Sequence, residues 1–588
     1  MTLFKEPIAL EIVKNALSTI AEEMGVTVVR SAYSTAVKEG GDATSAIFDG
    51  QGRLIAQSTG APLMHLSSLR PSLQELMKDF PPSQMSDGDI YIFNDPYRGG
   101  IHANDMMLFK PVFHDGRLAF FTTALIHVAD VGGMSAGGLP ANATETFQEG
   151  LLLPPVKLEE GGTPYGSVLA IVAANSRTPE KVLGDIRAMV AAVNIGARRL
   201  VALAERHGLD KLLSYTNDMM DYCEQRIRQE IQGLPPGVRE GSFVIDDDGV
   251  DEGRDFRVQV AITIVDSSLI ADFTGTDQQA RGPINASVSQ SMSGVLYALR
   301  CFIDPTIPMN EGCYRPLRVV LPEGTLVNPN PPAACNARMA TVMAIIEAML
   351  QAFSRHYPEA AVAASSNVQV YTMNGVDRST GKVWTFMDSQ FGGVGARSTK
   401  DGLDITPPLI FSGGSVAHTV EALEMEYPVR FRSYRLRQDS GGPGLWRGGL
   451  GIQRDVQILE DGQLTARVTD RCRRPPPGIF GGQPGKGGRW VVNPGTPQEV
   501  ELPPKVTGYA LRAGDTVAML TAAGGGFGPP MERDPRLVLR DVLDHRVSIE
   551  AARGDYGVSI APETMTVDDD ETRRLRAQAD VDGKESMT

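Results

Sequence analysis

The first hydrophobic pattern along the chain is helical. Pro7, a residue suited to the first turn of a helix, begins a segment that carries apolar residues at helical spacing to about residue 26. From residue 27 to about 126 the apolar residues instead form short runs separated by turn residues, which is typical of β-strands. The last two runs flank the turn His114-Asp115-Gly116-Arg117 and predict a strand–turn–strand unit that ends near His127.

The middle of the chain alternates between helical and strand patterns. Residues 179–232 have helical spacing and few helix-breaking residues. Residues 256–265 and 269–273 are strand-like runs joined by three polar residues, which predicts a hairpin. Residues 337–353 are mainly apolar and lack Gly and Pro, so we predict a buried helix there.

Beyond residue 427, glycine-rich segments separate short strand-like runs up to about residue 528, and residues 535–556 are again helical in pattern. The acidic run that begins at Val567 opens a polar tail predicted to be unfolded. These changes predict a mixed α+β, multi-domain protein. The predicted units are an N-terminal α/β domain (1–235), a central mixed domain (236–426), a β-rich domain (427–530), a C-terminal helical segment (531–565) and a disordered tail (566–588).

Charge and composition exclude several classes of protein. The chain has 71 acidic and 56 basic residues, which argues against a nucleic-acid-binding surface. It contains no apolar run of the roughly 18 residues needed to cross a membrane, and its first residues lack the pattern of a secretory signal. The five cysteines never form CxxC, so we expect neither a disulfide framework nor a zinc ribbon. These features favour a cytoplasmic protein.

The histidines are unevenly distributed, because four of the eight lie between positions 65 and 127. His102 and Asp105 form one HxxD pair, His127 and Asp130 form a second, and a pair of glycines adjoins each. Imidazole nitrogen with carboxylate oxygen suits zinc, manganese or ferrous iron, and glycine-rich loops let such side chains converge. We therefore predict a divalent metal site centred on His102, Asp105 and His127. Asp130 is a candidate for holding a histidine in its binding tautomer, and the competing interpretation is that these histidines are structural.

Other polar and glycine-rich motifs do not match a known metal-binding or phosphate-binding pattern. Asp246-Asp247-Asp248-Gly249 lacks the alternating ligands of a calcium loop, so a solvated turn is predicted. The glycine clusters at 481–486 and 524–528 do not match a phosphate-binding loop and are interpreted as turns. The sequence therefore offers no visible ATP site.

Several longer motifs point to a known family. They are Asn94-Asp95-Pro96-Tyr97 with Gly99-Gly100, His102 and Asp105; His127 with Asp130 and Gly132-Gly133; Asp272-Phe273-Thr274-Gly275-Thr276; Pro283-Ile284-Asn285; Gly392-Gly393 with Gly395-Ala396-Arg397 and Asp401-Gly402; Asp439-Ser440-Gly441-Gly442-Pro443-Gly444 with Arg447-Gly448-Gly449-Leu450-Gly451; Gly524-Gly525-Gly526 with Gly528 and Pro530; and Tyr556-Gly557-Val558. From about residue 6 to 558 the chain resembles the hydantoinase B/oxoprolinase family.

The resemblance implies the second subunit of an ATP-dependent hydrolase that opens hydantoins, 5-oxoproline or lactams. ATP would be bound by a separate hydantoinase A-type subunit with an actin-like fold, in a hetero-oligomer with two copies of each subunit. The resemblance also implies metal ligands at His102, Asp105, His127 and an aspartate near the N-terminus, which matches Asp42 best. Acetone and acetophenone carboxylase subunits are similar too.

The chain departs from the family pattern in two places. Family members usually have two adjacent histidines where this chain has His127-Val128, and many have Glu-Arg-x-Asp-Phe-Ser where this chain has Gly40-Gly41-Asp42-Ala43-Thr44. These departures leave the substrate and the metal open, with zinc as the first choice and manganese or iron as alternatives.

The leading prediction is a hydrolytic subunit whose metal activates water for attack on the cyclic amide. His65, Asp130 and Glu149 are predicted to orient the site or to relay protons. The alternatives are a ketone carboxylase subunit that uses the same site, and a scaffold without catalytic residues that completes a partner's active site.

Overall fold

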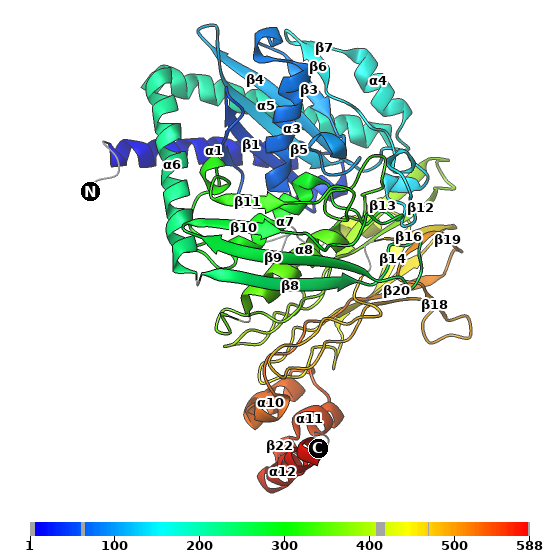
Figure 1. The fold of residues 1–588 in the computed structure, drawn as a ribbon. Helices are drawn as coiled ribbons and strands as arrows, with labels where there is room; N and C mark the ends of the chain where they lie inside the picture. The colour runs from blue at the N-terminus through cyan, green and yellow to red at the C-terminus, as the bar shows by residue number, and fades with distance from the viewer. Residues whose placement is uncertain are drawn as a thin grey trace.

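The computed structural model describes residues 6–59, 65–234, 236–354, 356–406, 418–467 and 470–585. These residues form four large β-sheets with flanking helices, and a small C-terminal unit. In Figure 1 the N-terminal unit lies at the top, the central unit in the middle and the C-terminal helices at the bottom. The predicted mixed, multi-domain fold is therefore confirmed. Among the described residues, no helix combines the length and apolarity that a membrane span requires.

The N-terminal unit is built on a seven-stranded antiparallel sheet. Its strands, in spatial order, are β2 (Leu54–Gln57), β1 (Ala43–Asp49), β5 (Arg117–His127), β4 (Asp105–His114), β3 (Ile90–Phe93), β6 (Val156–Glu160) and β7 (Thr163–Pro164). The predicted hairpin is confirmed as β4 and β5. Asp115 (φ 49°) and Gly116 (φ 75°) both have left-handed backbones, and such a two-residue turn matches the twist of paired strands.

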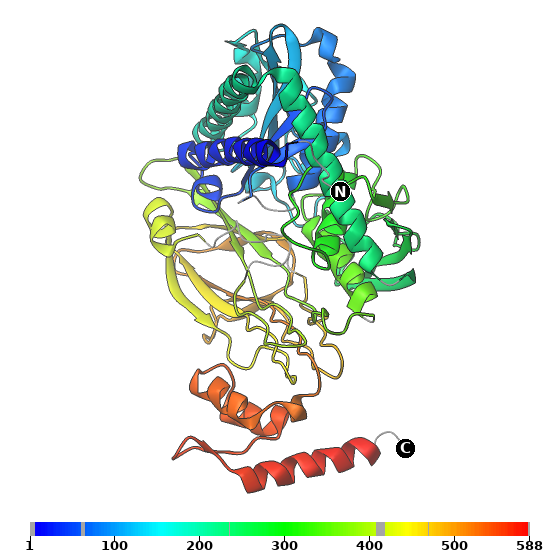
Figure 2. The same cartoon turned by 90° about the vertical axis from the view of Figure 1, so that its left-hand side faces the viewer.

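Helices cover both faces of this sheet, which explains why β1 and most of β4 are continuously buried. The helices of this unit are α1 (Pro7–Ser31), α2 (Thr35–Lys38), α3 (Leu66–Asp79), α4 (Gly166–Ala174), α5 (Pro179–His207) and α6 (Leu209–Gly233). The core on one face includes apolar residues of α1 and α5, and the core on the other includes Leu69, Leu73 and Leu76 of α3. Figure 2 shows α3 and α5 on opposite sides of the sheet.

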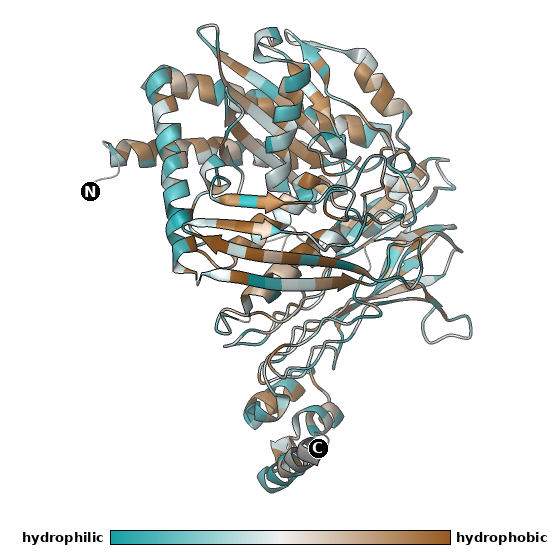
Figure 3. Ribbon diagram, viewed as in Figure 1, coloured by the Kyte–Doolittle hydropathy of each residue, from teal (hydrophilic) through white to brown (hydrophobic). Residues whose placement is uncertain are grey.

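The long helix α6 ties the N-terminal unit to the central unit. It runs along both units in Figure 1, and it is mainly hydrophilic on the side seen in Figure 3. Its first half contributes Leu212 and Met220 to the N-terminal core, and its second half contributes Ile227 and Ile231 to the central core. One continuous helix therefore contributes to the hydrophobic cores of both units.

The central unit pairs a four-stranded sheet with two buried helices. The strands are β11 (Leu317–Val320), β10 (Ser268–Asp272), β9 (Phe256–Val265) and β8 (Gly237–Ile245), and the helices are α7 (Val288–Arg300) and α8 (Met339–Ser354). Burial alternates along β9, because only one face of the sheet is covered by α8. The predicted hairpin at 256–273 and the predicted buried helix near 337–353 are both confirmed.

The remaining sheets face each other as a sandwich. One contains β13 (Val383–Gln390), β12 (Gln369–Val376), β16 (Gly462–Ala466) and β19 (Val506–Leu511). The other contains β14 (Val429–Leu436), β15 (Ile452–Ile458), β20 (Thr516–Leu520), β17 (Arg489–Val492) and β18 (Val500–Leu502), with α9 (Val420–Glu426) beside β14. Because β12 pairs with β16, the boundary drawn at 426/427 from sequence crosses a hydrogen-bonded sheet.

The predicted solvated turn at 246–248 is wrong, because all three aspartates are buried. Asp246 accepts hydrogen bonds from the backbone of Cys472 and Arg473, and Asp248 accepts one from Gly282. Asp247 lies 3.2 Å from the Lys505 ammonium. The acidic run therefore joins segments that are distant in sequence, and these backbone amides and the ammonium compensate its burial.

The glycine clusters are also more than turns. They pack as extended segments, with backbone against backbone: Gly524 N donates to Gly449 O at 2.8 Å and Gly393 N donates to Ala522 O at 3.2 Å. A Cβ added at Gly393 would lie 1.9 Å from Gly449 O. Only glycine fits such an approach, so these residues serve close packing rather than chain reversal alone.

The predicted disordered tail is instead mostly a helix. The C-terminal unit contains α10 (Pro535–Leu543), α11 (Ile549–Tyr556), the small pair β21 (Ile560–Ala561) and β22 (Thr566–Val567), and α12 (Asp569–Glu585). Asp568 accepts a hydrogen bond from Glu571 N, and three acidic residues occupy the first turn of α12. Negative charge at a helix N-terminus is stabilising, so the acidic run initiates this helix rather than preventing it.

Candidate metal centre

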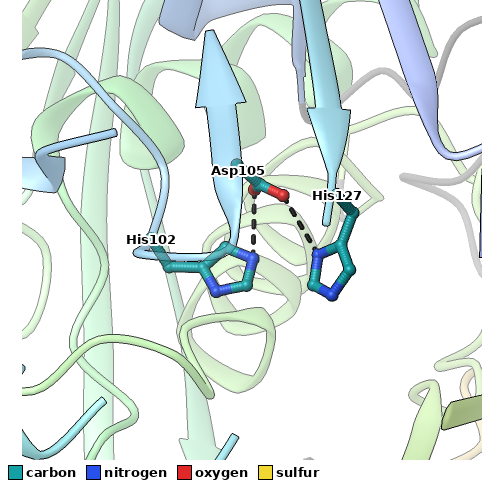
Figure 4. A group of neighbouring side chains, drawn as sticks. All are labelled: His102, Asp105 and His127. Carbon is teal, nitrogen blue, oxygen red and sulfur yellow. Dashed lines mark hydrogen bonds and ion pairs between the residues drawn. The ribbon is translucent and has the colours of Figure 1, made fainter. Parts of the chain in front are cut away.

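Three of the predicted ligands converge where the β4–β5 hairpin opens. Asp105 is the first residue of β4 and His127 the last of β5, and the register pairs them directly. His127 Nδ1 lies 3.1 Å from Asp105 Oδ1, and His102 Nε2 lies 3.1 Å from Asp105 Oδ2. Figure 4 shows the His102 imidazole on one side of the Asp105 carboxylate and the His127 imidazole on the other. The strand register thus brings together Asp105 and His127, which are 22 positions apart in the sequence.

The donor atoms of this cluster are buried and incompletely paired. Among the described residues, His102, Asp105 and His127 form a group whose ligand atoms all lie within 4.8 Å of one another. Nδ1 of His102 and Nε2 of His127 have no hydrogen-bond partner, and Nε2 of His102 has only the Asp105 carboxylate nearby, at 3.1 Å. A buried nitrogen without a partner is costly, whereas a divalent cation would accept these lone pairs together with the carboxylate. The residues therefore fit a metal ion.

The electrostatics of the cluster favour the protonation states that bind a cation. Burial, reinforced by the nearby Arg338, lowers the pKa of His102 well below its usual range, so the ring is neutral at pH 7. Burial acts to raise the pKa of Asp105, but His102, His127 and Arg338 together hold that pKa well below its usual range. A neutral imidazole at His102 beside the ionised carboxylate of Asp105 is a combination that ligates metals.

Asp42 and His65 lie beside this cluster. Asp42 directly precedes β1, and its carbonyl oxygen accepts a hydrogen bond from His127 N at 3.2 Å. Its Oδ1 lies 3.3 Å from His65 Nε2 and makes no hydrogen bond. His65 is buried, its Nδ1 lies 2.8 Å from Thr44 Oγ1, and burial lowers the pKa of the ring. The pairing of β1 with β5 therefore places Asp42 next to His127.

Glu149 supports the segment that faces the cluster, without touching a ligand. Its carboxylate accepts hydrogen bonds from Cys335 N, Asn336 N and Asn336 Nδ2 at 2.8–2.9 Å. Burial raises the pKa of Glu149 to about 7, against the lowering effect of these hydrogen bonds. Glu149 thus fixes residues 335–336 just before α8.

Asp130 is directed away from the cluster. Its carboxylate accepts hydrogen bonds from Gly137 N at 2.8 Å and from the Arg177 guanidinium at 3.0 Å, and it makes no described contact with His127. The chain leaves β5 at His127, so Asp130 belongs to the following loop. The pair that forms is His127 with Asp105 across the hairpin, rather than His127 with Asp130.

Sequence reasoning missed two buried arginines beside the cluster. Arg338 Nη2 lies 3.3 Å from Asp105 Oδ2, and Arg467 donates to Asn336 Oδ1 at 3.0 Å. Arg338 falls inside the apolar segment predicted as a buried helix, and the available signal was that this segment carries only two charges, Arg338 and Glu347. Arg467 follows β16 and carries no comparable signal.

Comparison with known proteins agrees with this architecture. The family model described as hydantoinase B/oxoprolinase matches residues 6–530. A protein of Pseudomonas sp. strain NS671 that is named as the B component of a D-/L-hydantoinase is 32% identical over 586 residues, covering 97% of this chain and 98% of that relative. The beta component of the caprolactamase from Pseudomonas jessenii is 30% identical, covering 94% of this chain and 96% of its own length.

Solved structures extend the likeness to the fold. The crystal structure of the ATP-dependent caprolactamase from Pseudomonas jessenii matches 97% of this chain and 99% of that chain, with a TM-score of 0.89 and 29% identity. A nucleotide-free acetone carboxylase has the same fold, with a TM-score of 0.90 at 20% identity over 99% of this chain and 84% of that chain. With the family model matched along nearly the whole chain, this protein belongs to the hydantoinase B/oxoprolinase family.

Proposed function

We propose that this chain is the metal-dependent hydrolytic subunit of an ATP-dependent enzyme that opens a cyclic amide such as a hydantoin, 5-oxoproline or a lactam. The observation that carries the proposal is the buried donor set of His102, Asp105 and His127, whose free ring nitrogens suit a cation. Asp42 is proposed as the fourth ligand, because it directly precedes β1, the strand that pairs with β5, and its Oδ1 makes no hydrogen bond. Zinc is the proposed ion, and manganese and iron are the alternatives.

A separate hydantoinase A-type subunit is proposed to bind ATP and to phosphorylate the amide oxygen. The hydantoinase and caprolactamase relatives are each named as one component of a larger enzyme, which supports the existence of a partner chain. This sequence has no phosphate-binding loop of the GxxxxGK[ST] type, which supports the same division of labour. We expect a complex with two copies of each subunit, and light scattering of the co-purified complex would test that composition.

The chain's own residues provide positioning and proton transfer around the ion. A divalent ion at this site would lower the pKa of a coordinated water and polarise the substrate carbonyl. His65 is proposed to relay protons at Nε2, which faces Asp42, while Thr44 holds Nδ1. Glu149 is proposed to fix the segment opposite the cluster, and Asp130 to fix the loop that follows His127.

The test is ATP-coupled ring opening by the complex, with metal content measured on the same samples. We expect His102→Ala to lose bound metal and to lower kcat at least ~100-fold, because one donor of a small ligand set is removed. His114→Ala is the matched control, since His114 lies at the opposite end of β4 from Asp105. Unchanged ring opening in the His102→Ala complex would contradict the proposal.

Two competing functions make different predictions in the same assay. A ketone carboxylase using this site would require bicarbonate and a ketone for ATP turnover, and would leave cyclic amides intact. A scaffold that only completes the partner's active site would give a complex that is active without metal. Ring opening that depends on both metal and ATP, without bicarbonate, is the outcome we expect.

A further inference from the structure

Two arginines beside the metal centre are buried together without adequate counter-charge. Arg338, directly before α8, is 3% exposed, and Arg467, directly after β16, is 4% exposed. Both donate through Nη1 to one acceptor, the carbonyl oxygen of Asn336, and Arg467 also donates to Asn336 Oδ1 at 3.0 Å. Two guanidinium groups therefore converge on a single uncharged residue.

Each arginine of this pair has one buried hydrogen-bond donor that is not used. Nε of Arg338 and Nε of Arg467 are buried and have no hydrogen-bond partner. Arg338 has one carboxylate contact, to Asp105 at 3.3 Å, whereas no described carboxylate forms an ion pair with Arg467. Burial, together with the nearby Arg338, lowers the pKa of Arg467 to about 9, so the group is still charged at pH 7. A buried unpaired charge is strongly destabilising unless a ligand compensates it.

The pair is held in place from the N-terminal unit. Glu149 binds both the backbone and the side chain of Asn336, and Asn336 Nδ2 also donates to Pro140 O at 3.0 Å. The Asn336 oxygens are therefore fixed, and they in turn orient both guanidinium groups. Such a built arrangement is typical of a binding site, because a fixed fork of N–H donors matches the oxygens of a carboxylate or phosphate.

The charge balance indicates the ligand class. With a divalent cation in the donor set, the cation and the two guanidinium groups would carry four positive charges, against at most three negative charges on the neighbouring carboxylates of Asp42, Asp105 and Glu149. A buried site with excess positive charge favours an anionic ligand.

We propose that Arg338 and Arg467 form an oxyanion subsite beside the metal centre, which binds the phosphoryl group of the activated amide or a carboxylate carried by the ring. This inference rests on the proposed function for the identity of its ligand. Both sources present oxygens to the same N–H donors, and binding measurements can separate them. Arg467 is the better residue to change, because it does not touch a proposed metal ligand.

The experiment is calorimetric titration of the full-length, zinc-loaded chain with inorganic phosphate and, separately, with 5-oxoproline. The variants are Arg467→Gln, which removes the positive charge, and Arg467→Lys, which keeps the charge but loses the paired N–H donors of the guanidinium group. Arg378→Gln is the control, since Arg378 is exposed and pairs with Asp461 at the surface. Zinc content and thermal unfolding are measured on every sample.

We expect wild type to bind at least one of the two anions, and Arg467→Gln to weaken that binding at least ~10-fold with zinc content unchanged. Arg467→Lys should weaken it less, and Arg378→Gln should not change it. Preferential binding of phosphate identifies the phosphoryl group as the ligand, and preferential binding of 5-oxoproline identifies the ring carboxylate; either result supports the subsite.

Absence of binding of both anions by wild type would overturn the inference, whatever the variants do. Equal affinity in wild type and in folded Arg467→Gln or Arg467→Lys would overturn it as well. The titration uses neither partner nor ATP, so its outcome is separate from ring opening by the His102→Ala complex. The subsite can therefore fail while the hydrolytic function stands, and the reverse also holds.

Discussion

Glu149 gives this protein a specific dependence of stability on pH. The carboxyl is fully buried, and burial raises its pKa from 4.5 to about 7 in the folded chain. In the unfolded chain the pKa returns to the ordinary value, so the folded state binds the proton more tightly. Stability linked to Glu149 is therefore present below about pH 4.5 and is lost as the pH rises towards 7.

The size of the effect follows from the shift in pKa. A difference of roughly 2.5 pKa units corresponds to about 3 kcal/mol of unfolding free energy. Glu149→Gln is neutral at every pH and keeps an oxygen that can accept from Cys335 N and Asn336 N. We therefore expect the variant to match wild type near pH 4.5 and to be more stable by up to about 3 kcal/mol near pH 7.5.

The assay compares thermal unfolding of the metal-free chains at a series of pH values. The difference in Tm between Glu149→Gln and wild type should grow steadily from pH 4.5 to 7.5. Glu563→Gln is the control, because Glu563 is an exposed carboxylate of the C-terminal unit. A difference in Tm that stays constant across this range would refute the assignment of a raised pKa to Glu149.

Three further predictions address ligation, packing and helix capping. If the proposed zinc site exists, Asp105→Asn should reduce bound zinc to a trace by elemental analysis, because an amide replaces the carboxylate that lies between the two imidazoles. Gly393→Ala should destabilise the chain by about 2–3 kcal/mol or prevent folding, because its Cβ would meet Gly449 O, whereas Gly554→Ala in open helical space should lose nothing in Tm. Asp568→Ala should cost about 1 kcal/mol of α12 stability, seen as faster amide exchange in residues 569–585, because Glu571 N loses its cap.

The sequence alone determined the features that depend on near neighbours. Helical spacing after Pro7, the polar segments that join strand pairs, and the apolar run at 337–353 each gave elements that the structure contains. The β4–β5 hairpin is the most useful case, because its turn at Asp115-Gly116 is visible in the sequence. The facing of Asp105 with His127 also requires a β-bulge between Val112 and Phe113, which shifts the register by one residue and has no signal in the sequence. The hairpin that carries these residues was therefore predictable from a local signal, whereas their exact pairing was not.

Only the tertiary structure decided how charges far apart in sequence are compensated. The buried Asp246 and Asp247 depend on partners more than 200 residues later. Arg338 and Arg467 likewise lie beside the candidate metal centre although they come from different units. The glycine segments look like turns until their packing partners are known. Spacing and turn chemistry act over a few residues and are visible in one sequence, whereas burial of a polar group is favourable or costly only according to which distant group it meets.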